Sequence, residues 1–154
     1  MKRYSYSVCL AFVVLALLGL SRPVLAEERP FQLQRGQIYP SLFSNSDTLA
    51  LVQIFGEITQ LGQTGGGGLV SFIDVGVDGA FHARGIIGFV AANGDRLYAT
   101  FVGSGFLDFY FEWIDGLEGT LTFVGGTGRF ADASGSADLV YLRGRSSIEG
   151  AIDY

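Results

Sequence analysis

Short runs in which apolar and polar residues alternate follow one another from residue 48 to residue 154. They are rich in β-branched and aromatic residues and none has a helical period, so each predicts a strand. The eight runs are 48–59, 69–77, 80–91, 95–102, 106–114, 117–124, 135–142 and 146–154. Turn dipeptides separate several of them, notably Asp78-Gly79, Asn93-Gly94 and Asp115-Gly116.

Eight consecutive strands without helices predict an all-β meander. An open sheet of this size would leave two unpaired edges, whereas closure into a barrel removes both. We therefore expect an eight-stranded antiparallel closed β-barrel over residues 48–154. A barrel of eight strands has an interior that side chains fill or that holds one small ligand.

The segments before residue 48 have a different pattern. Residues 1–26 begin with Lys2 and Arg3, continue as an apolar run and end at a small-residue site at Ala26, which predicts a secretory signal peptide. The apolar run is too short for a membrane-spanning helix, so a retained anchor is the less favoured alternative. Residues 27–47 show no periodicity and predict an irregular N-terminal arm.

Between the first and second runs, the glycine-rich residues 60–68 predict a mobile loop.

Composition narrows the possible functions. Cleavage after residue 26 would leave seven arginines against fifteen acidic residues, a net charge of −8. Such an acidic chain is a poor partner for nucleic acid or anionic lipid. The only cysteine, Cys9, lies within the expected signal peptide, which excludes a disulfide or thiol chemistry in the processed chain. These features are typical of a periplasmic or secreted protein, and they leave a homo-oligomer open.

The densest group of glycines lies between the sixth and seventh runs, in the sequence VGGTGRFADASG. Gly125, Gly126 and Gly128 can take positive φ at little steric cost, and Arg129 and Phe130 can fix the resulting corner. No helical pattern follows, so a phosphate-binding loop is not indicated. We expect Phe130 to close one end of the barrel and Arg129 to hold the corner by hydrogen bonds.

Three parts of the chain carry a resemblance to a known family. They are the turn Ala92-Asn93-Gly94-Asp95, the corner sequence GGTGRF and the terminal sequence GAIDY. With them, residues 69–154 resemble bacterial secreted proteins of the allene oxide cyclase barrel type, and dirigent proteins share the later corner. The resemblance implies an eight-stranded antiparallel barrel of the allene oxide cyclase or lipocalin kind.

The same resemblance points to one catalytic candidate. Plant cyclases of that family use a carboxylate on an early strand, with polar groups that hold a water, to act on an apolar epoxide. The nearest position here is Glu57, with Thr59 on the same face. The acidic-x-Asn pattern and the later Ser-Pro of those enzymes are missing from this segment. The resemblance therefore implies the fold rather than the activity.

Other chemistry-bearing residues are few. His82 is the only histidine, which excludes a polyhistidine metal site and makes a surface or structural role the favoured one. Tyr110 and Glu112 complete the catalytic candidates. No metal-ligand spacing or cofactor motif is present, so we expect neither a metal nor a cofactor.

The most informative strand is the fifth run. One of its faces is formed by Leu107, Phe109, Phe111 and Trp113. The opposite face contains Asp108, Tyr110 and Glu112. Burying such an aromatic face contributes on the order of several kcal/mol, so it must face either the barrel core or an apolar ligand.

Three functions remain under consideration. The first is a non-catalytic extracytoplasmic barrel that binds a small apolar molecule or a partner surface. The second is a cyclase or isomerase of the allene oxide cyclase kind, which needs a carboxylate that points into the barrel. The third is a small outer-membrane barrel, which needs longer strands and a polar interior. The scarcity of catalytic groups favours the first, and a membrane location is not expected after signal cleavage.

Overall fold

Eight antiparallel strands form one closed barrel in the computed structural model of this chain, which describes residues 27–43, 46–108 and 113–154. The strands are β1 (Arg29–Phe43), β2 (Ser46–Ile58), β3 (Gly62–Ile73), β4 (Ala80–Val90), β5 (Arg96–Asp108), β6 (Trp113–Gly126), β7 (Ser134–Leu142) and β8 (Arg145–Asp153). A short 3-10 helix, η1 (Gly128–Phe130), connects β6 to β7. The predicted all-β closed barrel is confirmed, whereas the expected signal peptide lies outside the described residues.

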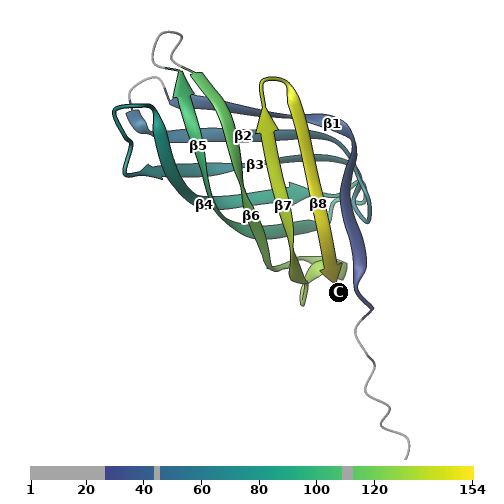
Figure 1. The fold of residues 1–154 in the computed structure, drawn as a ribbon. Helices are drawn as coiled ribbons and strands as arrows, with labels where there is room; N and C mark the ends of the chain where they lie inside the picture. The colour runs from purple at the N-terminus through teal and green to yellow at the C-terminus, as the bar shows by residue number, and fades with distance from the viewer. Residues whose placement is uncertain (1–26, 44–45, 109–112) are drawn as a thin grey trace, which may run out of the picture.

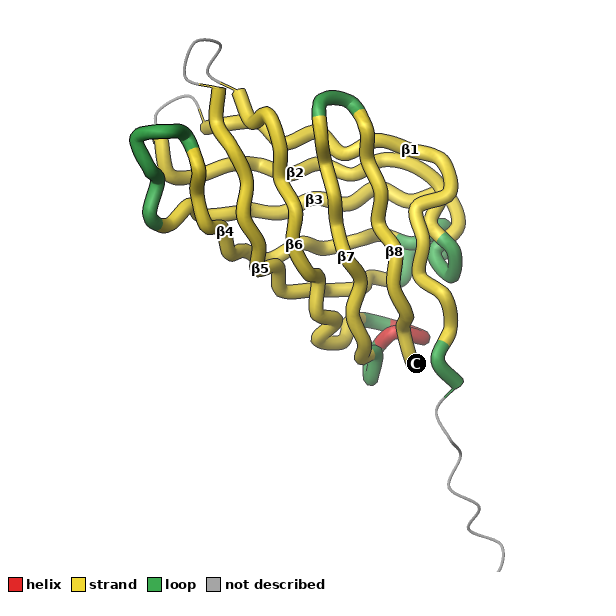
Figure 2. The backbone as a smooth tube through the Cα atoms, in the orientation of Figure 1, coloured by secondary structure: helices red, strands yellow, loops and turns green. Residues whose placement is uncertain are grey.

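Every strand pairs with its neighbours in the sequence, and β1 also pairs with β8 to close the barrel. In Figure 1 the strands β5 to β8 lie in front and run across the direction of β1 to β3 behind them. The end of β8 lies beside η1 and the start of β1, at the same end of the barrel (Figure 2). The opposite end has the β7–β8 hairpin.

The interior of the barrel is an apolar core. Along β4 the alternation is regular, with Phe81, Ala83, Ile87 and Phe89 buried and the residues between them directed outward. The inward side chains of the other strands join them in one hydrophobic cluster. Among the described residues Thr64 is the one buried polar side chain, and its hydroxyl donates a hydrogen bond of 2.6 Å to the Val90 carbonyl oxygen.

The prediction of an irregular arm at residues 27–47 is wrong, because most of that segment forms β1. Pro30, Gly36 and Pro40 interrupt the alternation in the sequence, yet each pairs with a neighbouring strand. Gly36 lies opposite Gly56 of β2, where a Cβ on Gly36 would come within 2.2 Å of a backbone oxygen. The residue that breaks the sequence pattern is therefore the one that lets two strands approach closely.

The prediction of a mobile loop at residues 60–68 is also wrong. The connection between β2 and β3 is a tight turn ending at Leu61, and the four consecutive glycines Gly65 to Gly68 lie within β3. Each of them is paired with β2 on one side and with β4 on the other. Sheet pairing on both sides overrides the low intrinsic strand preference of glycine.

The expected boundaries of the fifth run are wrong as well. Gly103-Ser104-Gly105 lies inside β5 rather than in a turn, and Asp115-Gly116 lies inside β6. Leu107 is thus near the end of β5 and Trp113 begins β6, with Leu107 opposite Ile114. The expected aromatic face is not a single strand face, because its two described ends lie on neighbouring strands.

Candidate functional site

The structure does not bring the described catalytic candidates together. Glu57 is on the outward side of β2, between the buried residues of that strand, and His82 is exposed on the outward side of β4. Glu57 lies opposite Gln63 of β3, whereas His82 lies opposite Ile73, about 33 Å further along that strand at the usual rise. Tyr110 and Glu112 lie outside the described residues.

Within the part of the chain that the structure describes, the barrel interior offers no charged group. No buried side-chain nitrogen or oxygen atom there is without a hydrogen-bond partner. The same residues include no cluster of three or more histidine or carboxylate side chains that could hold a metal ion. The inward side of the described barrel is therefore built for packing.

The glycine corner, residues 124–135, lies at the end of the barrel where β8 ends (Figure 2). Gly125 has a φ of +103° and Gly128 of +58°, and Phe130 is fully buried with its ring 4.9 Å from that of Tyr154. The backbone N–H of Arg129 donates to Asp95 at 3.3 Å, and its guanidinium donates to the Gln60 carbonyl oxygen. These contacts join the corner to the β4–β5 and β2–β3 turns, which gives it a structural role.

At the opposite end a cleft of about 470 Å³, the rim cleft, contains part of the expected ligand-binding face. Trp113 is 54 % exposed there, while Leu107 packs partly against the core. Phe109 and Phe111 lie outside the described residues. The rim cleft is lined by Pro40, Asp108, Trp113, Ile114, Asp115, Tyr141, Arg143 and Gly144.

A bidentate ion pair between Arg143 and Asp115 forms the polar wall of the rim cleft. The Arg143 guanidinium donates to both carboxylate oxygens of Asp115, from Nε at 2.7 Å and from Nη2 at 2.9 Å. These hydrogen bonds, with the attraction between the two charges, hold the pKa of the Asp115 carboxyl below its ordinary value. Arg143 itself has a φ of +35° in the β7–β8 turn.

Replacing Arg143 with glutamine is expected to raise the pKa of Asp115 toward its ordinary value, as measured by carboxyl carbon NMR titration. In the folded wild type the carboxylate keeps its charge to lower pH than in the unfolded chain. The ion pair therefore contributes stability above about pH 4 and loses it as the pH falls through the lowered pKa. Arg145→Gln, in the same hairpin, is the control and should leave the pKa unchanged. An unshifted Asp115 in Arg143→Gln would contradict this assignment.

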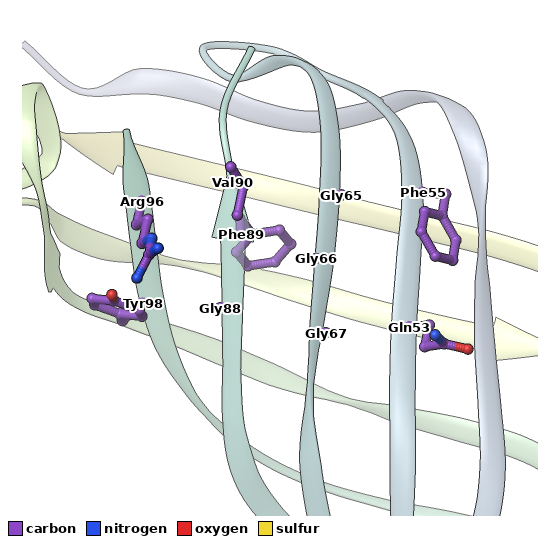
Figure 3. A pocket seen from close by; sticks show the side chains of 10 residues that line it. All are labelled: Gln53, Phe55, Gly65, Gly66, Gly67, Gly88, Phe89, Val90, Arg96 and Tyr98. Carbon is purple, nitrogen blue, oxygen red and sulfur yellow. The ribbon is translucent and has the colours of Figure 1, made fainter. Parts of the chain in front are cut away.

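A second depression, the outer groove, lies on the outside of the barrel across β2 to β5. Two rows of outward positions cross these strands in register. One row consists of Phe55, Gly65, Val90 and Arg96. The other consists of Gln53, Gly67, Gly88 and Tyr98. Figure 3 shows the glycines of β3 running between Phe55 and Gln53 on one side and Val90, Arg96 and Tyr98 on the other. The volume of the outer groove is about 550 Å³.

Gly65, Gly67 and Gly88 form the floor of the outer groove, because they have no side chain that projects outward. A Cβ on Gly65 would have no atom within 4 Å, and one on Gly88 would be in ordinary contact with the Tyr98 ring at 3.4 Å. A Cβ on Gly67 would be 3.2 Å from the Val52 carbonyl oxygen, which is tight but close to tolerable. In contrast, a Cβ on the inward-facing Gly68 would lie 1.9 Å from the Ile86 carbonyl oxygen.

Exposed apolar side chains surround the outer groove. Phe55 is 50 % exposed and Ile86 is 64 % exposed, and both lie on the outward side of the sheet. We call the outer face the part of the outward side of β2 to β5 that carries the exposed apolar residues Phe55, Leu69, Ile86, Val90, Tyr98 and Val102. Phe106, further along β5, is also exposed on this side but lies beyond the outer face as defined here. Tyr39 of β1 continues it, with its ring 6.3 Å from that of Phe55.

Comparison with protein-family models, curated proteins and solved structures found no match for this chain. Over the described residues, no helix has the length and apolar character required to cross a membrane. The assignment of function therefore rests on the surfaces and clefts of the barrel itself. Sequence reasoning does not reveal the outer groove, because the glycine-rich residues 60–68 predict a loop rather than a strand.

Proposed function

We propose that the protein is a non-catalytic extracytoplasmic binding protein that works through the outer face of its barrel. The observation that carries this proposal is the contrast between the two sides of the sheet. The inward side chains form a packed apolar core, and the outward side of β2 to β5 still presents large apolar residues to solvent. Export is inferred from the signal-like residues 1–26.

The size of the apolar surface supports binding to a partner. The six residues of the outer face, two aromatic and four aliphatic, each present on the order of 75–100 Å², or roughly 450–600 Å² together. Patches at this upper end of the range for monomers commonly mark interaction sites. The partner can be another protein or a second copy of this chain.

The distribution of charge favours this proposal over an outer-membrane barrel. Such barrels have a polar interior and an apolar outer band. Here the described interior is apolar, and the outward side includes the exposed charged residues Arg84, Glu118, Asp138 and Glu149 within strands. A cyclase activity is likewise less favoured, because Glu57 lies on the outward side of β2.

A small apolar ligand in the rim cleft is a second candidate, favoured by the exposed side chain of Trp113 and by Tyr141, which both line the cleft. Because Trp113 is the only tryptophan of the chain, its fluorescence would report such a ligand directly. A change in its emission maximum on addition of a ligand would support this candidate. An unchanged spectrum with a ligand shown to bind would exclude the rim cleft as its site.

The main proposal predicts that cross-links form on one side of the barrel. A photoreactive benzoylphenylalanine in place of Leu69 or Ile86 is expected to give a discrete adduct in producing cells. The same group in place of Asp138 or Glu149, on the outward side of β7 and β8, is the matched control and should give none. An adduct of twice the chain mass would identify a second copy as the partner. Equal cross-linking from both sides, or from neither, would contradict the proposal.

A further inference from the structure

We propose that the outer groove is a socket for an aromatic side chain of a partner protein, and that a carboxylate next to that ring binds Arg96. This inference rests on the proposed function, since it assigns the chemistry that the outer face recognises. It follows from three properties of the outer groove. These are floor glycines with room for a side chain, a width that fits one ring, and the Arg96 guanidinium, which has no acidic partner among the described residues.

Two of the three floor glycines, Gly65 and Gly88, are not required by the fold. Gly65 and Gly88 have ordinary backbone conformations and room for a side chain, as the distances to a Cβ show. Glycine within a strand lowers stability relative to residues that pack on the sheet. Positions that lower stability without a packing reason are expected where a surface has a function.

The width of the outer groove fits one flat ring. Phe55 and Val90 lie on the strands that flank β3, so a ring above Gly65 would have each wall about 5 Å to its side at the normal strand spacing. In the other row the Tyr98 ring lies 3.4 Å from a Cβ position on Gly88, so a ring above Gly67 would have Tyr98 on one side and Gln53 on the other. Aromatic rings pack at centroid distances of about 4.5–7 Å. An aromatic ring that covers glycine in a sheet is also a known stabilising arrangement.

The openness of the outer groove favours a macromolecule over a small ligand. Small-molecule sites enclose most of their ligand, whereas this depression is open to solvent. Leu69 and Ile86 lie in the next row and could exclude water around a bound ring. An aromatic anchor within a ring of apolar contacts is the usual centre of a protein interface.

Arg96 selects the charge next to the ring. It lies at the β5 end of the first row, beside Val90. Among the described residues no acidic side chain is within ion-pair distance of its guanidinium. In a chain of net charge −5 this guanidinium is a local positive site. A carboxylate adjacent to the bound ring would form an ion pair with this guanidinium.

Titration of the nitrogen-15-labelled protein with short capped peptides would test the socket. A Phe-Glu peptide is expected to shift the backbone amides of residues 65–67, 88 and 98. A Leu-Glu peptide should bind about three- to tenfold more weakly, because it lacks a ring. A Phe-Gln peptide should bind about two- to fivefold more weakly, as expected for an exposed ion pair. Equal affinity for Phe-Glu and Leu-Glu would overturn the proposal.

Two variants and one control locate the binding. Gly65→Leu fills the floor and should abolish the saturable shifts, whereas Ser71→Leu, on the same side of the same strand beyond the outer groove, should leave them intact. Arg96→Gln cannot disturb the core, and it should make the Phe-Glu and Phe-Gln affinities equal. Undiminished binding by Gly65→Leu, with a spectrum that shows the folded barrel, would overturn the proposal.

Two further outcomes separate this proposal from the one on which it rests. If phenylacetate bound as tightly as the Phe-Glu peptide, the outer groove would be a small-molecule site and the partner-protein proposal would be wrong. If cross-linking from Ile86 persisted in Gly65→Leu while no peptide bound the wild type, the outer face would still be the interface and only the socket would be wrong. Loss of the Ile86 adduct in Gly65→Leu, but not in Ser71→Leu, would support the socket.

Discussion

Gly126→Val is expected to destabilise the protein by about 3 kcal/mol or more, a large part of the stability of a domain of this size. A Cβ at residue 126 would lie 2.0 Å from the Arg96 carbonyl oxygen and 3.0 Å from the Phe130 side chain. The clash involves backbone, so β5 and β6 would have to separate where the glycine corner begins. Urea unfolding followed by circular dichroism would measure the loss, and we expect no folded but inactive form.

Gly65→Val is the matched control for this prediction. It introduces the same side chain at another strand glycine, but into open space on the outer groove floor. Its stability should equal that of the wild type or exceed it, because valine prefers strands. A Gly126→Val protein that is as stable as Gly65→Val would show that the close approach of β5 and β6 at the corner is not needed for folding.

Phe31→Ala should cost about 3–5 kcal/mol, the usual range for a fully buried phenylalanine. The Phe31 ring packs edge-on against Phe123 at 4.7 Å and Phe89 at 5.8 Å. It also belongs to the short segment of β1 that pairs with β8. We expect hydrogen exchange at residues 149–152 to accelerate in this variant, because the seam between the first and last strands is weakened.

Tyr39→Ala provides the comparison for Phe31→Ala. Tyr39 is an aromatic residue on the same strand, but it is half exposed and directed outward. Its truncation should change the free energy of unfolding by no more than about 1 kcal/mol. If Phe31→Ala lowered the free energy of unfolding as little as Tyr39→Ala does, Phe31 would not belong to the core. That result would contradict its buried position.

The sequence supported the barrel for reasons that were only partly correct. Alternation located β4, β7 and β8 to within about a residue, since each has a regular inward apolar set and a turn dipeptide at its boundary. The count of eight strands was reached through two errors that cancelled. The segment that forms β1 was omitted, and the long strand β5 was divided at Gly103.

Both errors arose from glycine and proline inside strands. In a sequence these residues predict turns, because their local preference is all that can be seen. In the barrel they mark places where strands approach closely, as Gly103 does with a Cβ position 2.1 Å from the Glu118 carbonyl oxygen. Such contacts join residues far apart in the chain, so periodicity within one segment cannot reveal them.

The sequence predicts the candidate site less well than it predicts the fold. The outer groove depends on the register of four strands, which places Gly65 and Gly67 beside Gly88 and between Phe55 and Tyr98. One signal was present, since Thr64 and Val70 continue the inward alternation on either side of the four glycines. A glycine run whose flanking residues keep the same inward alternation is compatible with a continuous strand that has no side chains on its outward side over that stretch.

The pairing of β1 with β8 also determines the order in which the barrel can fold. Arg29 to Gln32 must meet Glu149 to Ile152, a contact between opposite ends of the described chain. Every other strand pair is formed by sequence neighbours, so an open sheet can grow along the chain during synthesis, and closure comes last. Until β8 is available the sheet has two free edges and an uncovered apolar side. The barrel therefore cannot be completed before the last strand of the chain is available.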